Sequence, residues 1–209
     1  MPFTTDVAKD VEVAPLQAGP SVGLYMLDGF GGLTAFGGAP ALTGVALGHD
    51  IARDFELDYN PDGSIKGGYI LDGRGAMNPV GGSALIVPPA PFLIDQDIYV
   101  DAELVKNPAD LSVLGAFVLS KFGLISTAGP LSASFINNTL KGVPNFGFNI
   151  ARDLELSIDV NSGGVIGVYV LDGFGGIHAG GSAPKIHDAP FFGFDVARDL
   201  ELLRNAPQD

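Results

Sequence analysis

A short phrase in which apolar and polar residues alternate recurs five times along the chain. In the second copy, Arg53, Phe55 and Leu57 fall on one face and the acids fall on the other. Such alternation is typical of a β-strand, so we predict a strand at every copy. The copies are DVAKDVEV from Asp6, DIARDFEL from Asp50, DIYVDAEL from Asp97, NIARDLEL from Asn149 and DVARDLEL from Asp195.

A second phrase alternates with the first and predicts a β-hairpin. It has an aromatic and β-branched run, an Asp-Gly turn and a glycine-rich return, which is a hairpin pattern. In the third copy, Ser120 and Lys121 replace the Asp-Gly pair. A looser strand is predicted in 182–193 (SAPKIHDAPFFG) and in its counterparts, such as 88–94 (PPAPFLI). The four hairpin copies are LYMLDGFGGLTAFGG from Leu24, GYILDGRGAMNPVGG from Gly68, AFVLSKFGLISTAG from Ala116 and VYVLDGFGGIHAGG from Val168.

Together these phrases predict an all-β fold made of tandem repeats. Each repeat would hold about four short antiparallel strands in roughly 45–50 residues, which is the size of a propeller blade. We therefore predict a single repeat domain over 1–209, a small β-propeller of four blades with a terminal closing strand. The predicted repeats span 1–44, 45–90, 91–143 and 144–190, followed by an extra terminal strand in 191–209.

The strand phrase occurs once more often than the hairpin. One terminal copy could close the ring between the first and last blades, the chain could be cut from a longer array, or the spare strand could pair with another chain. Closure is favoured because an unpaired edge strand promotes aggregation. The chain would accordingly be a monomer, or a homo-oligomer joined through the spare strand.

The composition limits the classes of binding partner more than it limits the type of reaction. The formal charge is −13 over 209 residues, which argues against nucleic acids and anionic membranes and favours cationic partners or metal ions. There is no cysteine, so disulfides and thiolate metal sites are excluded. No apolar run has transmembrane length. Acidic, cysteine-free chains suit secreted or cell-surface bacterial proteins, and since MPFTTDVAKD is no signal peptide, an exported form would already have lost its leader.

The phrases GGYILDGRGAMNPVGG and VYVLDGFGGIHAGGSAP, each flanked by a DIARDxEL phrase, resemble the G-Y-V-L-D-G-x-G-G-x-H-x-x-G repeats of bacterial surface and secreted proteins. That resemblance implies an extracellular propeller that binds proteins, glycans or ions. The blade order is also similar to the four-bladed hemopexin fold, whose closing disulfide this chain cannot form. Neither resemblance implies a catalytic residue here.

One acidic position recurs in every copy of the strand phrase and is the candidate metal site. In a propeller, equivalent positions form rings about the axis, so these carboxylates could converge on Ca²⁺ or another channel cation, which prefers oxygen ligands. The favoured alternative is structural, with each acid pairing with a base of a neighbouring blade. Val100 replaces the base in the third copy, which makes Asp101 the odd carboxylate. The candidate ligands are Asp54, Asp101, Asp153 and Asp199.

Other polar residues point to structure rather than to chemistry. The turn aspartates Asp28, Asp72 and Asp172 are explained by bonds to their own turn amides, since neither the lysine nor the spacing of a phosphate-binding loop is present. The histidines lack metal-ligand spacing, and no nucleophile motif occurs.

We therefore expect a non-enzymatic binding or structural module that recognises a protein or glycan through blade loops, with no cofactor other than a channel cation. The loops that break the repeat, 107–115 and 130–147, are the expected binding region. The alternative is a carboxylate-dependent hydrolase or lyase at one end of the channel.

Overall fold

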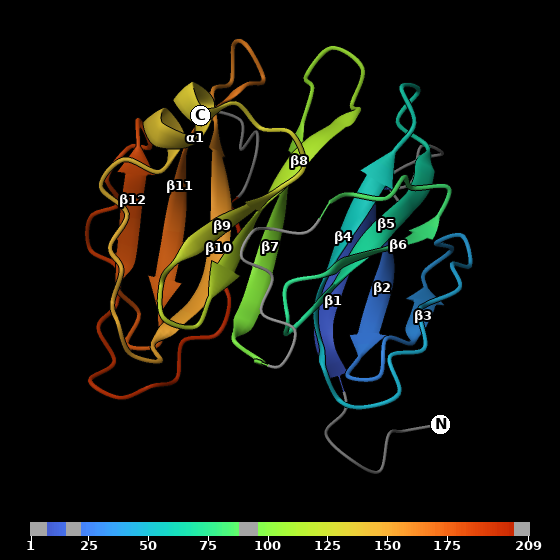
Figure 1. Cartoon of the computed structure of the whole chain (residues 1–209), viewed down its shortest axis with the longest axis horizontal. Helices are drawn as coiled ribbons and strands as arrows, with labels where there is room; N and C mark the ends of the chain where they lie inside the picture. Colours follow the sequence, from blue (N-terminus) through green and yellow to red (C-terminus); the bar gives the residue numbers. More distant parts are fainter. Residues whose placement is uncertain (1–7, 16–21, 88–95, 203–209) are drawn as a thin grey trace. The chain divides into compact units, whose positions relative to one another are not determined.

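The computed structural model describes residues 8–15, 22–87 and 96–202, which form four antiparallel sheets of three strands each. The sheets follow one another along the chain, and in each the strands lie in sequence order (Figure 1). The strands are β1 (Ala8–Pro15), β2 (Val22–Asp28), β3 (Leu33–Phe36), β4 (Ala52–Tyr59), β5 (Ile65–Asp72), β6 (Met77–Gly81), β7 (Tyr99–Lys106), β8 (Val113–Ser120), β9 (Ile125–Ala128), β10 (Ala151–Ile158), β11 (Val165–Asp172) and β12 (Ile177–Gly181).

The all-β class and the four sequential repeats are confirmed, but the predicted fourth strand of each repeat is not. Residues 182–193 contain no strand, and Pro184 and Pro190 within them have no N–H to donate to a ladder. Segment 88–94, the other predicted example, lies outside the described residues. Within the described ranges, each repeat is therefore one strand phrase plus one hairpin.

The chain divides into two compact units. The first comprises residues 1–120 and 125–131 and contains the sheets from β1 to β9. The second comprises residues 121–124 and 132–209 and contains the sheet β10-β11-β12.

A β-bulge interrupts the strand phrase at the same place in all four sheets. In the second sheet Ala52 pairs with Asp72 and Asp54 with Leu71, so Arg53 is an extra residue without a cross-strand partner. The same shift occurs between Ala8 and Asp10, between Tyr99 and Asp101, and between Ala151 and Asp153. Strict alternation had placed Arg53 on the apolar face, and that placement is wrong because a bulge redirects the side chain.

Beyond the bulge, the phrase presents its apolar side chains to the preceding repeat. Phe55 and Leu57 are 1% and 0% exposed and belong to one core cluster with Tyr25 and Leu27 of β2. The rings of Tyr25 and Phe55 meet edge-on, with centroids 5.6 Å apart, a favourable aromatic geometry. Within the first unit, the second strand of one repeat thus covers the first strand of the next.

The predicted hairpins are confirmed, including the degenerate third copy. In the first hairpin the N–H of Gly31 donates to the carbonyl of Asp28 and closes a short turn. Gly31 has φ +88°, and its equivalent in the third copy, Gly123, has φ +87°. This left-handed conformation favours glycine, so the third hairpin keeps its turn although Ser120-Lys121 has replaced Asp-Gly.

The connection 130–147, which breaks the repeat, contains the one helix of the described residues, α1 (Ala133–Thr139). Ser132 caps it by accepting a hydrogen bond from the N–H of Phe135, as serine does at helix starts. Among the described residues, no helix has the length and apolarity needed to cross a bilayer.

Position within the repeat predicts the cost of truncating a side chain. Leu57 is 0% exposed, whereas Val13, at the same position of the first phrase, is 49% exposed. Replacing Leu57 with alanine should lower the free energy of unfolding by about 2–5 kcal/mol, and Val13→Ala should change it by less than about 1 kcal/mol. Urea unfolding measures both, and equal losses would contradict the repeat-on-repeat core.

Candidate functional site

The charged residues of each strand phrase lie close to the hairpin turn of their own repeat and to the strand phrase that follows it. We call this region the repeat junction. Its first component is a turn carbonyl that accepts two backbone N–H groups from the following phrase. The Gly73 carbonyl accepts from Ile98 and Tyr99 at 2.8 and 3.0 Å. The same pair of bonds joins Gly29 to Ile51 and Ala52, Lys121 to Ile150 and Ala151, and Gly173 to Val196 and Ala197.

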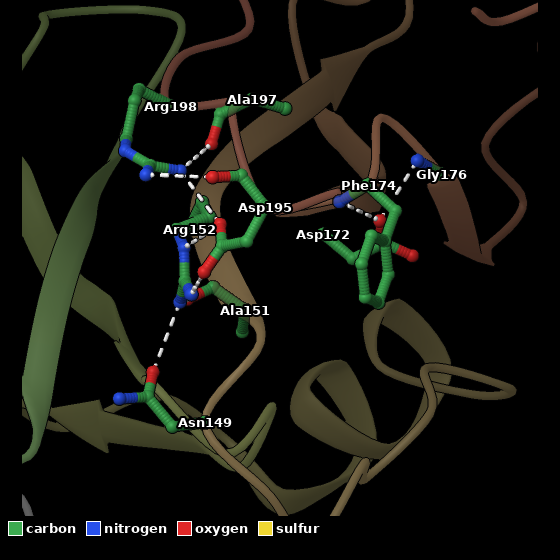
Figure 2. Close-up of polar contacts among 9 residues, drawn as sticks. All are labelled: Asn149, Ala151, Arg152, Asp172, Phe174, Gly176, Asp195, Ala197 and Arg198. Carbon is green, nitrogen blue, oxygen red and sulfur yellow. Dashed lines mark hydrogen bonds and ion pairs between the residues drawn. The ribbon is translucent and has the colours of Figure 1, made fainter. Parts of the chain in front are cut away.

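The second component is an ion pair between the base of one phrase and the first acid of the next. Lys9 contacts Asp50 at 3.2 Å, and Arg53 contacts Asp97 at 2.5 Å. In the second unit Arg152 bonds Asp195 through Nε at 3.1 Å and through a terminal nitrogen, while Arg198 contacts the same carboxylate (Figure 2). In these ion pairs the base binds the first acid of the next phrase, and not the repeated strand aspartate for which the pairing was predicted.

A missing side chain in the turn makes room for this acid. A Cβ on Gly73 would overlap the Asp97 carboxylate oxygen Oδ1, and a Cβ on Gly173 would overlap Asp195 Oδ1. In the third hairpin the turn residue is Lys121, and the phrase that follows begins with Asn149 in place of aspartate. The turn glycine and the acid are thus lost together.

The third component is the repeated strand aspartate, which accepts a backbone hydrogen bond from the next phrase. Asp54 Oδ2 accepts from the N–H of Ala102 at 3.2 Å. Asp10 accepts from Phe55 at 3.2 Å, and Asp153 accepts from Leu200 at 3.1 Å. A hydrogen bond contributes about 0.5–1.5 kcal/mol, so this contact has at least the weight of a partly exposed ion pair, at about 0–1 kcal/mol.

These observations locate the four candidate metal ligands. Asp54 and Asp101 are buried, at 8% and 9% exposed, while Asp199 is exposed. Asp54 and Asp153 each hold the next phrase through its backbone. Within the described ranges, no group of three or more acids or histidines is placed to hold a metal ion. The cation site stays a prediction.

Asp153 has an unusual environment for a carboxyl group. Burial, followed by the negative charges of Asp199 and Glu155, raises the pKa of Asp153 to about 8. The hydrogen bond from Leu200 lowers this pKa but does not offset burial. At Asp195 the balance is opposite, because the hydrogen bond from Arg152 lowers the pKa of that carboxyl.

The turn aspartates make the bonds predicted for them. Asp172 Oδ1 accepts from the N–H groups of Phe174 and Gly176 at 2.8 and 2.9 Å (Figure 2). Asp28 and Asp72 accept two turn amides each in the same way. Asp172 also contacts His178 through Oδ2 at 2.8 Å, which places that histidine in a structural pair.

Sequence reasoning missed two features of the junction. It did not single out the first acids of the phrase, although each follows a turn glycine by 21 to 24 residues. It also missed Asp58, which is 0% exposed and contacts Lys66 at 3.0 Å and Ser83 at 2.9 Å. No counterpart of Asp58 exists in the other strand phrases, so no repeated pattern pointed to it.

No family model matches the chain, and no curated protein or solved structure matches it either. The likeness to bacterial surface repeats and to the hemopexin fold therefore remains a resemblance.

The close approach of Asp97 to Gly73 predicts that a side chain at this turn glycine destabilises the repeat junction. Gly73→Ala should lower the free energy of unfolding by about 1–3 kcal/mol, because the added methyl overpacks against the Asp97 carboxylate. Gly164→Ala is the control, since a Cβ there meets only Ser162 Oγ at 3.4 Å. Chemical denaturation compares the two, and a Gly73 variant as stable as the control would contradict this packing.

The raised pKa of Asp153 predicts how stability depends on pH. Its carboxyl keeps its proton up to about pH 8 in the folded state, whereas in the unfolded chain it loses the proton near pH 4. The stabilisation is complete below about pH 4 and is lost as the pH rises towards 8. Wild type should therefore lose stability relative to Asp153→Asn between pH 5 and pH 8 in urea unfolding. A stability difference that is constant or grows with pH would contradict the assignment.

Proposed function

We propose that this chain is a non-enzymatic binding or structural module of the β-propeller type, and that it recognises a protein or glycan through the connections between its repeats. In this proposal the four sheets act as blades, and a terminal copy of the strand phrase completes the array. Supporting it are the sequential order of the sheets and the recurrence of one junction.

The charged residues of the repeat have tasks in the junction. Arg53 and Arg152 bind acids of the following phrase, and Asp54 and Asp153 hold backbone N–H groups. Groups repeated in this way serve the stacking of repeats. Recognition is then left to residues that differ between repeats, which lie in the connections.

The observation that carries the proposal is a set of exposed phenylalanines in the connections of the second unit. Phe148, Phe191 and Phe194 are 57%, 77% and 65% exposed. The rings of Phe191 and Phe174 lie 6.0 Å apart, and those of Phe146 and Phe148 lie 6.4 Å apart. Exposed aromatic side chains are typical of interaction surfaces, and aromatic residues are enriched where partners bind.

The same proposal favours an extracellular setting. The acidic charge of −13 would repel nucleic acid and anionic lipid, and the likeness to bacterial surface repeats points the same way. Glycan rings with apolar faces, or a protein with apolar and basic side chains, would fit a surface that combines phenylalanines with an acidic background.

A second candidate, a carboxylate-dependent hydrolase or lyase, is favoured by one observation. A carboxyl with a pKa of about 8, as at Asp153, would keep its proton at neutral pH, as a general acid must. The bond from Leu200 gives this group a structural task as well. Turnover of a glycan that Asp153→Asn abolishes, without loss of folding, would favour the enzyme over the binding module.

The binding proposal is tested with the whole chain on glycan and bacterial surface-protein arrays. Phe191→Ser should reduce binding at least tenfold while leaving the melting temperature within about 2 °C, because an exposed side chain contributes little to stability. Val160→Ser is the matched control, since Val160 is 85% exposed in another loop. Absence of any array signal above background, or equal losses in the two variants, would contradict the proposal.

A further inference from the structure

The second repeat holds a buried carboxyl group beside a lysine amine, in the hairpin that joins β4 to β5 (Figure 1). Asp58 is 0% exposed, and Lys66 Nζ lies 3.0 Å from its oxygen Oδ2. Ser83 Oγ donates to the same oxygen at 2.9 Å. The other oxygen, Oδ1, is buried and has no hydrogen-bond partner among the described residues.

An ion pair alone leaves half of this carboxylate unsatisfied. A buried acceptor without a partner destabilises the folded state, and more so when it carries charge. An amide between the side chains of Asp58 and Lys66 would contain one oxygen instead of two, and that oxygen would be the one that already accepts from Ser83. Amide formation therefore removes the unsatisfied atom, whereas an ion pair keeps it.

The other repeats show that the fold does not need these three polar groups. Gly67 pairs with Asp58 and follows Lys66, and a Cβ on it would lie 2.8 Å from Ser83 Oγ. The equivalent glycines of β2, β8 and β11 locate the same three positions in the other repeats. Within the four described sheets, the acid, the amine and the hydroxyl donor thus occur together in the second repeat only. The residues at these positions are Ala14, Val22 and Ala39 in the first repeat, Val105, Leu114 and Leu131 in the third, and Ser157, Ile166 and Ala183 in the fourth.

We propose that Asp58 and Lys66 are joined by an amide bond between their side chains, and that the chain forms this cross-link on itself. The bond would close the hairpin between β4 and β5 at residues 58–66. The inference goes beyond the proposed recognition function and does not depend on the ligand.

The step consumes only the two side chains and releases one water molecule. One proton first passes from Nζ to Oδ1, which converts two ions into a neutral amine and a neutral acid, the pair that burial favours. The Nζ lone pair then forms a bond to Cγ, and the electrons of the Cγ–Oδ2 double bond move onto Oδ2, where the Ser83 hydroxyl stabilises the charge. A second proton passes from Nζ to the Oδ1 hydroxyl, and the Cγ–Oδ1 bond breaks. Water leaves as the Cγ–Oδ2 double bond re-forms, and no oxidant or reductant takes part.

The fold supplies what this condensation needs. Nζ is held 3.0 Å from an oxygen that is bonded directly to Cγ, and such positioning replaces a bimolecular encounter. Burial of Asp58 keeps bulk water, which would reverse the reaction, away from the product. The Lys66 side chain is partly exposed, so the released water can leave on that side.

Mass spectrometry of the denatured full-length protein tests the proposal. Wild type, purified and kept at neutral pH, should be lighter than its sequence requires by the mass of one water molecule. Lys66→Arg should have its full mass, because a guanidinium keeps the ion pair with Asp58 but does not form the amide. Lys185→Arg, at an exposed lysine, is the matched control and should keep the loss. Wild type of full mass would overturn the proposal, as would a Lys66→Arg variant that still lacks one water, since that loss would come from another site.

Tryptic digestion locates the bond without a variant and therefore decides the question even if Lys66→Arg does not fold. Trypsin does not cut after a lysine whose amine is in an amide, so wild type should yield residues 54–74 as one peptide that lacks one water. Separate peptides 54–66 and 67–74 would overturn the proposal. Wild type without the amide that still binds its array ligand would refute the cross-link alone, which keeps this test separate from that of the proposed function.

Discussion

The structure depends on one interaction: backbone N–H groups of the second to fifth strand phrases are held by acceptors that belong to the repeat before each of them. The turn carbonyl of Gly73 accepts two of them and Asp54 accepts a third. Buried N–H groups need partners, and a sheet of three strands leaves its first strand with one unpaired edge. The junction supplies those partners. It therefore fixes the register between each strand phrase and the repeat before it.

Apolar packing and charge pairing are organised around this constraint. Once Asp54 and Ala102 are joined, Tyr69 and Leu71 of one repeat and Leu104 of the next fall into one core cluster. Burial of such side chains contributes about 1.5–3 kcal/mol each, which exceeds the contribution of the partly exposed ion pairs. The bases and first acids of the phrase therefore align the repeats more than they stabilise them. That ranking explains why the third phrase can lose its base and the third turn its glycine while the carbonyl bonds to Ile150 and Ala151 persist.

Much of this architecture could be predicted from the sequence because it is repeated. Five strand phrases and four hairpins revealed the all-β class and the repeat number, and the Asp-Gly turns revealed the bonds of Asp172. The bulge at Arg53 was not predicted, because the phrase alternates without a visible break and the extra residue shows only in the pairing with the next strand. The fourth strand was predicted from apolar residues alone, although the prolines in 182–193 oppose it.

The candidate site was only partly predictable for the same reason. The repeated acids drew attention, but whether a carboxylate meets a cation, a base or a backbone N–H depends on distances that no spacing conveys. Asp58 occurs in one repeat only. No repeated pattern could therefore indicate that it is buried beside Lys66. The sequence likewise contains the phenylalanines, but it does not show that Phe148, Phe191 and Phe194 are exposed.

Amide hydrogen exchange followed by NMR tests the junction most directly. The N–H groups of Phe55, Ala102 and Leu200 donate to Asp10, Asp54 and Asp153, and they should exchange much more slowly than the N–H of Gly142, which lies in a connection. Protection by a factor of at least about 10² is the predicted result, because closed hydrogen bonds exchange only when the structure opens. Exchange of these three amides at the rate of Gly142 would contradict the account, since the repeats would then be held together by something other than the aspartate bonds.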